Sequence, residues 1–465
     1  MDYDKRHVKW YWLFLFLVYC GAVIYLLFAA NPYLYSHHEL RAAMNHSDSM
    51  ELLTIPAESG QRQKLTDPTF FSRFNFSHSA VDPVGSPRNK NYTEFKKYPV
   101  QLNEENFTVE KIAQDPSGFY LASTSPWIIS VGLTGEVRWK FRMRDLGENQ
   151  AAWAPLLDQE TAYIFHPGGE VYGVNKETGT LVWTTRLDDE IISQPFMWKD
   201  ELIIPVEREK GPIWLRLHRA DGRVAPKKIK LDIASPFEVS LGPGGKSLLF
   251  TTDNKLYSVD PNTWEIVWSL SVTDPIKGPA VVAESQIFLA TLGAKIVKVD
   301  GGKKAKVDWE VDLEKAPASP PSFLPVVNRL SVQLVGGTLV AIDVKLGKVL
   351  WSYNNENHNP LTDTWSVRLS AKHIEEFKMD WLHKGWTIWS ACGSRKICIY
   401  TPNKGQLVER IVMSASPMTL PLPVEKTWIS FGEIKPGQYE ISHLLEQSEI
   451  KKILAESATE TQKPQ

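Results

Sequence analysis

The sequence predicts an all-β protein whose short strands form a ring of repeated blades, a β-propeller. A unit of two short strands joined by a turn recurs seven times between residues 128 and 411. Corresponding positions in most successive units lie 41 to 44 residues apart, and this period suits blades of four strands. The 28 glycines and 30 prolines are spread along the chain, as expected when many strands are joined by turns.

Composition agrees with a folded globular chain. The 465 residues are 43% hydrophobic and 23% charged, and these proportions exclude a mostly disordered protein. The formal net charge is −2 and no long basic run occurs, so nothing predicts binding to nucleic acid. Three cysteines are too few for a fold built on disulfides.

Residues 8–30 are apolar apart from Lys9 and are predicted to form a transmembrane helix. A span of 23 residues exceeds the roughly 20 helical residues that a bilayer core requires. Lys5 and Arg6 precede it, so residues 1–7 are expected to be a cytoplasmic tail and the rest extracytoplasmic. A cleaved signal peptide is the alternative, but the residues before Ala30 form no small-x-small cleavage site. Lipidation at Cys20 is disfavoured because a tyrosine precedes it.

Residues 31–98 show no sustained helical or strand period and are predicted to form a polar stalk. Four glycosylation sequons begin at Asn45, Asn75, Asn91 and Asn106. They would be exposed, modified sites in a eukaryotic secretory protein and chance matches otherwise. Three histidines, His37, His38 and His46, are expected to be solvated, because no carboxylate or cysteine set completes a metal site.

The seven units share one chemistry. They occupy residues 128–141, 171–185, 215–228, 256–270, 296–311, 339–353 and 397–411. An apolar strand leads to a turn former, and in most copies a glycine-containing turn and a second strand ending near tryptophan follow. The tryptophans are Trp139, Trp183, Trp268, Trp309 and Trp351, and the same slot holds Pro226 and Glu409 in the other two units. Gly179 and Gly347 are expected to close turns at positive φ, and Gly135 is the glycine of the first unit, while each indole packs between blades.

The segments Asn175 to Trp183 and Asp343 to Trp351 resemble the PQQ-like repeat and its tryptophan docking motif. The resemblance covers about residues 100 to 447, and in size the chain is similar to the nonenzymatic propellers of the outer-membrane assembly factor BamB group. Three departures are the absence of a lipobox, the residues that replace tryptophan in two units, and Trp264 in place of a turn glycine.

The blade count follows from the two ends of the repeat region. Two further strands are expected at 427–431 and 438–441, with no closing strand after them. We expect residues 106–113 to supply that strand, which closes an eight-bladed ring over 99–447; a seven-bladed ring is the alternative. Residues 448–465 are expected to be a flexible tail.

The last interval contains an insertion. Residues 371–385 have a helical apolar face that includes Phe377 and Trp381, which either packs on its own blade or docks a protein partner. Nearby, Cys392 and Cys398 flank a tight turn. They could form a disulfide in an oxidising compartment or remain two buried thiols.

The sequence favours a binding role over catalysis. The quinoprotein dehydrogenases that the repeats resemble use PQQ with calcium, a catalytic aspartate and commonly a disulfide between adjacent cysteines. This chain has neither a Cys-Cys pair nor a haem-type Cys-x-x-Cys-His, so no catalytic, cofactor or metal residue is assigned and no small-molecule substrate is expected. The neighbouring Asp188, Asp189 and Glu190 are interpreted as a solvated loop.

The expected protein is a nonenzymatic scaffold anchored in the inner membrane, with its propeller in the bacterial periplasm and an unidentified protein as partner. A role in envelope protein assembly is implied by the resemblance alone. The alternatives are a PQQ-dependent dehydrogenase and an anchored eukaryotic glycoprotein ectodomain.

Overall fold

The computed structural model describes most of the predicted propeller. The described residues are 79–81, 92–102, 107–145, 152–208, 212–226, 229, 231, 233, 238–283, 285–302, 304–324, 328–355, 364–368, 386–419, 421–424 and 427–446. The predicted anchor, most of the stalk, residues 371–385 and the tail lie outside them, as do all four sequon asparagines. Every described strand belongs to one compact unit, Leu53–Gln465. In the described part, no helix is long and apolar enough to cross a membrane.

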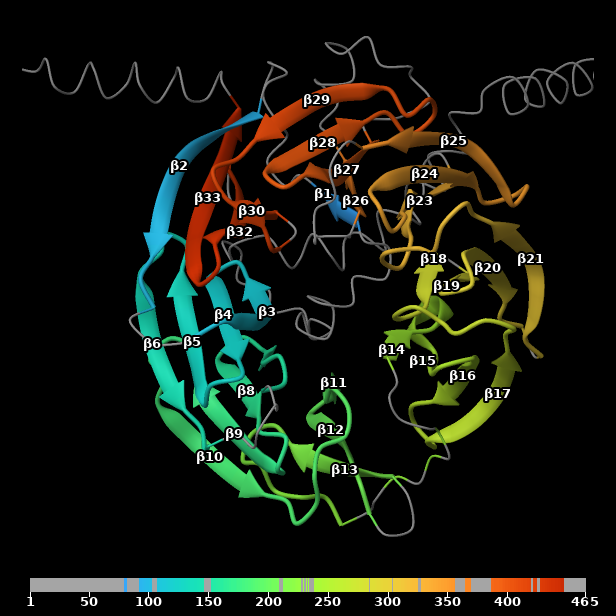
Figure 1. The fold of residues 1–465 in the computed structure, drawn as a ribbon. Coiled ribbons are helices and arrows are strands. Elements are labelled where there is room, and N and C mark those ends of the chain that lie inside the picture. Colours follow the sequence, from blue (N-terminus) through green and yellow to red (C-terminus); the bar gives the residue numbers. More distant parts are fainter. Residues whose placement is uncertain are drawn as a thin grey trace, which may run out of the picture. The chain divides into compact units, whose positions relative to one another are not determined.

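Eight β-sheets form the blades of a ring, so the predicted eight-bladed propeller is confirmed (Figure 1). Blade 1 comprises β3 (Val109–Asp115), β4 (Gly118–Ser123), β5 (Trp127–Gly132) and β6 (Val137–Arg142). Blade 2 comprises β7 (Leu156–Leu157), β8 (Thr161–Phe165), β9 (Glu170–Asn175) and β10 (Leu181–Arg186). Blade 3 comprises β11 (Phe196–Trp198), β12 (Glu201–Val206) and β13 (Ile213–His218). Blade 4 comprises β14 (Glu238–Leu241), β15 (Leu248–Thr251), β16 (Lys255–Asp260) and β17 (Glu265–Ser271), with one 3-10 turn, η1 (Pro243–Gly245).

The second half of the ring follows the same order. Blade 5 comprises β18 (Val281–Ala283), β19 (Gln286–Thr291), β20 (Lys295–Asp300) and β21 (Lys306–Asp312). Blade 6 comprises β22 (Ser322–Leu324), β23 (Arg329–Gln333), β24 (Thr338–Asp343) and β25 (Lys348–Asn354). Blade 7 comprises β26 (Thr364–Arg368), β27 (Trp386–Gly393), β28 (Lys396–Tyr400) and β29 (Leu407–Val412), and β1 (Ser79–Val81) pairs in parallel with β26. Blade 8 comprises β30 (Ser416–Pro417), β31 (Leu422–Val424), β32 (Thr427–Lys435), β33 (Gln438–Glu446) and β2 (Tyr92–Val100).

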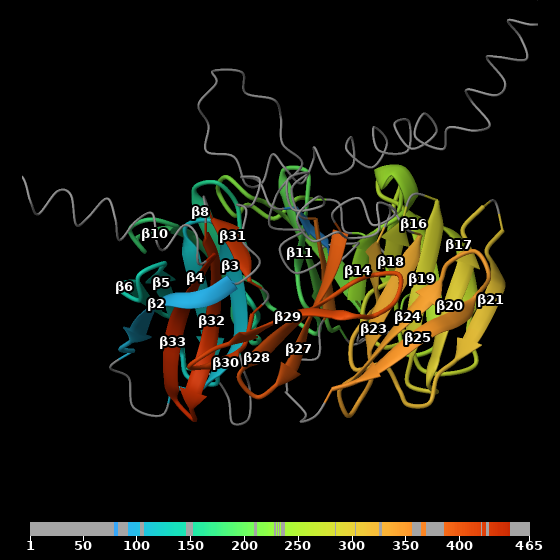
Figure 2. The ribbon, with the colours of Figure 1, turned by 90° about the horizontal axis from the view of Figure 1, so that it is seen from above.

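The core lies between the blades. Alternate residues of a strand point to opposite faces of its sheet, so a strand inside the ring serves two cores. In β19, Phe288 and Ala290 pack between blades 5 and 6, whereas Ile287 and Leu289 pack between blades 4 and 5. This double burial explains why the second strands of most blades are continuous apolar runs. Figure 2 shows the ring edge on, with the fourth strands at its perimeter.

A β-bulge turns each docking tryptophan toward the next blade. In β25 the register to β24 shifts between Ala341, opposite Trp351, and Ile342, opposite Val349, so Leu350 is the extra residue. The same shift occurs ahead of Trp139, Trp183, Trp268 and Trp309. A bulge re-aims the side chain beside it, and here it re-aims the indole out of its own sheet. The repeat therefore encodes both a hairpin and a contact to the following blade.

The ring closes through strands from the two ends of the domain, as expected, but the closing strand is a different one. β2 pairs antiparallel with β33 and is the outermost strand of blade 8. Residues 106–113 were expected in this place, and instead their strand, β3, opens blade 1 through a short hairpin with β4. A two-residue turn makes the β3–β4 pairing local and therefore easy to close. The closing strand consequently begins at Tyr92, inside the segment that was expected to be stalk, and β1 of blade 7 lies in that segment too.

Blade 3 departs from the repeat. Residues 215–228 were expected to contain two strands, but the described residues there form only β13 and an isolated bridge at Val224, with a second bridge just beyond them at Ile229. Pro226 has no N–H to donate to a strand ladder, and it occupies the tryptophan slot. Trp264, at φ 60° in the next blade, packs into the core between blades 3 and 4 and lies 6.5 Å from the Phe196 ring. We interpret the indole of Trp264 as a replacement for the tryptophan that blade 3 lacks at Pro226.

Candidate functional site

Four of the predicted tryptophans dock on the turn of the next blade through a hydrogen bond. The indole Nε1 donates to a backbone carbonyl from Trp139 to Lys176 (2.8 Å), Trp183 to Arg219 (3.0 Å), Trp309 to Val344 (3.0 Å) and Trp351 to Pro402 (2.9 Å). Trp268 packs in the core between blades 4 and 5. Trp139 is buried and the other four are half-buried. The turns of neighbouring blades are therefore held in fixed positions.

The predicted turn glycines have a second role that spacing alone did not reveal. Gly179 and Gly347 have φ of 73° and 59°, as expected for turn closure. A Cβ on Gly179 would lie 2.6 Å from Trp139, and one on Gly347 would lie 2.8 Å from Trp309. A Cβ on Gly135 would instead lie 3.0 Å from the Pro99 carbonyl oxygen, in the closing strand β2. Each of these glycines thus makes room for the preceding element of the ring.

Blade 7 contains a disulfide, which is one of the two states that the sequence allowed for its cysteines. Cys392 and Cys398 are bonded, with their Cα atoms 5.7 Å apart. Both are buried in the core between blades 6 and 7. Cys392 lies at a β-bulge of the β27–β28 hairpin, where the register shifts between Ala391 and Gly393. The bond therefore ties together two strands at a point where their ladder is interrupted.

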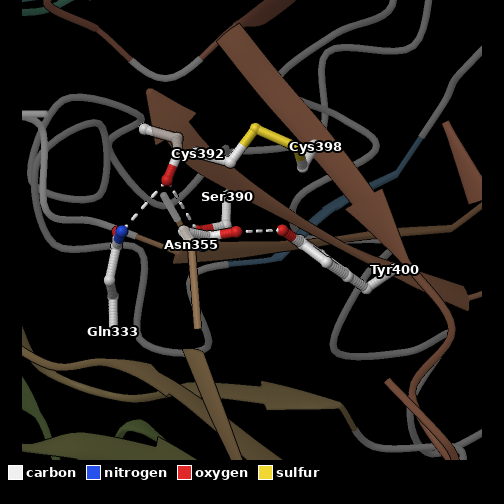
Figure 3. Close-up of a disulfide and its surroundings, with 7 residues drawn as sticks. Gln333, Asn355, Ser390, Cys392, Cys398 and Tyr400 are labelled. Carbon is white, nitrogen blue, oxygen red and sulfur yellow. Dashed lines mark hydrogen bonds between the residues drawn. A yellow bond between two sulfur atoms is a disulfide. The ribbon is translucent and has the colours of Figure 1, made fainter. Parts of the chain in front are cut away.

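Buried polar side chains surround this hairpin and connect it to blade 6 (Figure 3). Gln333 Nε2 donates to the Ala391 carbonyl oxygen at 3.0 Å, and the Ser390 hydroxyl donates to the same oxygen at 3.2 Å. The Tyr400 hydroxyl donates to Asn355 Oδ1 at 2.5 Å. Burial raises the pKa of Tyr400, so the phenol stays protonated and remains a donor.

Sequence reasoning missed this group of polar residues. Gln333 and Asn355 lie in blade 6, at or just past the ends of β23 and β25, and their partners are far along the chain. Their remaining amide atoms, Gln333 Oε1 and Asn355 Nδ2, have no hydrogen-bond partner within the described part of the chain. No local pattern distinguishes such residues from solvated turn residues.

The strands of blade 7 lead into and out of the predicted partner-docking segment. β26 ends at Arg368 and β27 begins at Trp386. Phe377 and Trp381 lie outside the described residues, so the two interpretations of this segment stay predictions. The blade that carries it is fastened by the disulfide and by the contacts with blade 6. The strands that flank the segment therefore belong to a blade that is tied to blade 6 by a hydrogen bond.

The acidic cluster that the sequence interpreted as a solvated loop is partly paired. Asp189 Oδ2 lies 2.6 Å from Arg208 Nη2, while Asp188 and Glu190 are exposed. Within the described ranges, no group of three or more histidine, cysteine or acidic side chains could hold a metal ion.

The ring and its docked tryptophans define an eight-bladed propeller of PQQ-like repeats. The chain belongs to the family described as outer membrane protein assembly factor BamB, whose model matches residues 127–225 and 225–373. No curated protein matches the sequence.

Solved structures share the fold at low sequence identity. BamB from Moraxella catarrhalis is 13% identical, with a TM-score of 0.53 over 76% of this chain and 100% of that chain. Quinohemoprotein alcohol dehydrogenase from Comamonas testosteroni is 11% identical, with a TM-score of 0.55 over 79% of this chain and 78% of that chain. Sqt1 from Saccharomyces cerevisiae is 10% identical, with a TM-score of 0.52 over 78% of this chain and 100% of that chain. These likenesses show the fold alone.

Proposed function

We propose that this protein is a nonenzymatic scaffold, anchored in a membrane, that binds a protein partner through the segment inserted in blade 7. The observation that carries the proposal is the construction of this blade, which is fastened by a disulfide and tied to blade 6. The inserted segment supplies Phe377 and Trp381, and aromatic residues are enriched among the residues that dominate binding energy. A rigid base reduces the ordering cost that such a segment pays on binding.

The proposed location is the inner membrane of a bacterium, with the propeller in the periplasm. The apolar residues 8–30 and the basic residues before them support a single span with the propeller outside. The Cys392–Cys398 disulfide supports an oxidising compartment independently. Membership of the BamB family supports a role in envelope protein assembly.

The tether has its own test. The full-length protein should remain with membranes after an alkaline wash, and external protease should reach the propeller once the outer barrier is opened. Recovery of a soluble mature chain beginning near residue 31 would refute the anchor. A gel shift after N-glycosidase treatment would favour the anchored eukaryotic ectodomain instead.

The partner-docking role is tested by crosslinking in cells. The double variant Phe377→Ser/Trp381→Ser should lose a specific crosslinked partner while its melting temperature stays that of the parent. Leu181→Ser/Val182→Ser is a matched control, because these aliphatic side chains are exposed on the perimeter of blade 2. If the first variant keeps the crosslink, or loses stability by several kcal/mol, the segment packs on its own blade.

Catalysis is the second candidate, because a quinohemoprotein alcohol dehydrogenase has a similar fold. The single described disulfide joins residues six positions apart, and the sequence contains no adjacent cysteines. We expect the purified protein to bind no PQQ, with or without calcium, and to oxidise no alcohol or sugar. Stoichiometric PQQ binding with dye-linked alcohol oxidation would overturn the nonenzymatic proposal.

A further inference from the structure

We propose that one side of the ring binds the surface of an anionic lipid bilayer, through the turns that join the third and fourth strands of blades 5, 6 and 7. We call this surface the basic arc. Its lysines are Lys304, Lys306, Lys345, Lys348 and Lys404, and its apolar residues are Leu346, Val349, Leu350 and Leu407. None of its residues belongs to the inserted segment, and the proposal does not depend on the docking of a protein partner.

The topology places these turns on one side of the molecule. The turns β20–β21, β24–β25 and β28–β29 are equivalent loops of three consecutive blades, and equivalent loops of a propeller emerge on the same side. Tryptophan docking fixes two of them, because Trp309 donates to Val344 and Trp351 donates to Pro402. The side chains at the turn tips are therefore presented by an ordered backbone.

The lysines of the basic arc have little charge compensation from the protein. All five are exposed, and only Lys306 forms an ion pair, 3.8 Å from Asp300, among the described residues. Three nearby acidic side chains pair with other cations: Asp308 with Lys298, Asp343 with Arg329, and Glu310 with Lys295. Four lysines are thus available to an external anion.

Among the described residues, unpaired lysines are concentrated in this arc; the equivalent turn of blade 3 carries Arg219 and Arg223, but these pair with Asp158 and Asp221. In the equivalent turns of blades 1, 2 and 4, exposed glutamates stand where the arc has lysines: Glu136, Glu177 and Glu265. Lysines therefore occupy the turns of the arc, whereas glutamates occupy matching positions in blades 1, 2 and 4. Such an uneven distribution orients a molecule toward a charged surface.

Exposed aliphatic side chains lie among the lysines. Leu346 is 66% exposed in the β24–β25 turn, between Lys345 and Lys348. Val349 and Leu350 follow it on β25, and Leu407 occupies a similar place in blade 7. Apolar residues beside basic ones bind the interface of an anionic membrane, where the lysines meet headgroups and the aliphatic groups enter the acyl boundary.

The chemistry favours a lipid surface over an acidic protein segment. Peptide recognition uses a groove or a paired strand edge, whereas the arc presents separate turn tips on three blades. Lipid headgroups are fluid and can supply a negative charge wherever a lysine stands, so they suit cations that have no fixed partner. Contact with the bilayer would hold the ring in one orientation above the membrane.

A fluorescent reporter on the arc tests the proposal in the full-length protein. Cys20→Ser removes the free thiol, and Gln406→Cys then places one environment-sensitive probe in the β28–β29 turn. Thr180→Cys is the matched control, because Thr180 is exposed at the equivalent position of the β9–β10 turn in blade 2. Each labelled protein is incorporated into vesicles of phosphatidylcholine with or without phosphatidylglycerol, and insertion of the N-terminal stretch is scored separately by alkaline wash.

We expect a blue-shifted emission and quenching by spin-labelled lipid only for the probe at 406, only with phosphatidylglycerol, and with reversal at high salt. Lys345→Gln/Lys348→Gln/Lys404→Gln should lower the ratio of docked to free rings by roughly a hundred-fold, because one lysine contributes about five-fold. Leu346→Ser should also weaken docking, whereas Val182→Ser, at an exposed aliphatic residue of blade 2, should not.

Three results would overturn the proposal. The probe at 406 could report the same environment in both kinds of vesicle, or the probe at 180 could respond equally. The probe could also respond only in native membranes and never in protein-free vesicles, in which case an acidic protein occupies the arc.

Discussion

The contact between a turn glycine and the preceding tryptophan gives a sharp test of how the blades are held together. Gly347 has φ 59°, and a Cβ built on it would lie 2.8 Å from Trp309 Cγ and Cδ2. Gly437 in blade 8 has φ 76°, and a Cβ there would meet nothing within 4 Å. Alanine at either position strains the backbone to a similar extent, but only the alanine at 347 collides with a neighbouring side chain.

The expected costs follow from this difference. An alanine in the left-handed region costs about 1–2 kcal/mol, and this should be the whole effect of Gly437→Ala. Gly347→Ala adds an overpacking cost of about 1–3 kcal/mol, because the indole must move away from the Val344 carbonyl to which it donates. We therefore expect Gly347→Ala to destabilise the protein by about 2–5 kcal/mol.

Urea unfolding followed by far-ultraviolet circular dichroism measures both variants in the full chain. A double-mutant cycle with Trp309→Ala then isolates the contact, because removing the indole should reduce the cost of Gly347→Ala to that of Gly437→Ala. If the two glycine variants lose the same free energy of unfolding, the indole moves aside without any loss of stability, and the reasoning is wrong. Persistence of the extra cost in the Trp309→Ala background would show that it has another origin.

Three further predictions concern the ring closure, blade 3 and the disulfide. Burial raises the pKa of Glu94, but hydrogen bonds from Ser442 and Ser414 outweigh burial, so this pKa lies below its usual value. For His443, burial disfavours the charged imidazolium and lowers the pKa. Stability should therefore fall as pH drops below about 6.5, where the unfolded His443 takes up a proton, and again below about 4.3 as Glu94 is protonated. Thermal melts from pH 7 to pH 3 should show His443→Gln without the first loss and Glu94→Gln without the second. Trp264→Gly restores the usual glycine of the turn. It should nevertheless destabilise the protein by about 2 kcal/mol or more, because the core between blades 3 and 4 loses an indole. A rise in melting temperature would contradict the idea that Trp264 makes up for the tryptophan that Pro226 replaces. Cys392→Ala/Cys398→Ala should cost about 2 kcal/mol, the entropy expected for so short a loop, and a reducing agent should lower the stability of the parent but not of the variant.

The sequence by itself determined the repeat and much of what the repeat does. A hairpin with a turn former, a glycine and a tryptophan at constant spacing is local information, so the third and fourth strands of most blades and the docking of Trp309 and Trp351 could be predicted. Seven units, with further strands at the two ends of the repeat region, likewise predicted eight blades. The repeat unit is defined by residues close together in the sequence, so it can be recognised from a single sequence.

The tertiary structure decided the pairings between distant segments. Closure by residues 92–100 rather than 106–113 was settled by the competition between a local hairpin and a strand from the other end of the domain. Trp264 of blade 4 packs against Phe196 of blade 3, and Gln333 and Asn355 of blade 6 form hydrogen bonds with blade 7. The state of Cys392 and Cys398 depended on whether a bulge brought the two thiols within bonding distance. Spacing along one chain does not contain these distances, because they arise only when the hairpin of blade 7 forms its bulge and the blades meet around the ring.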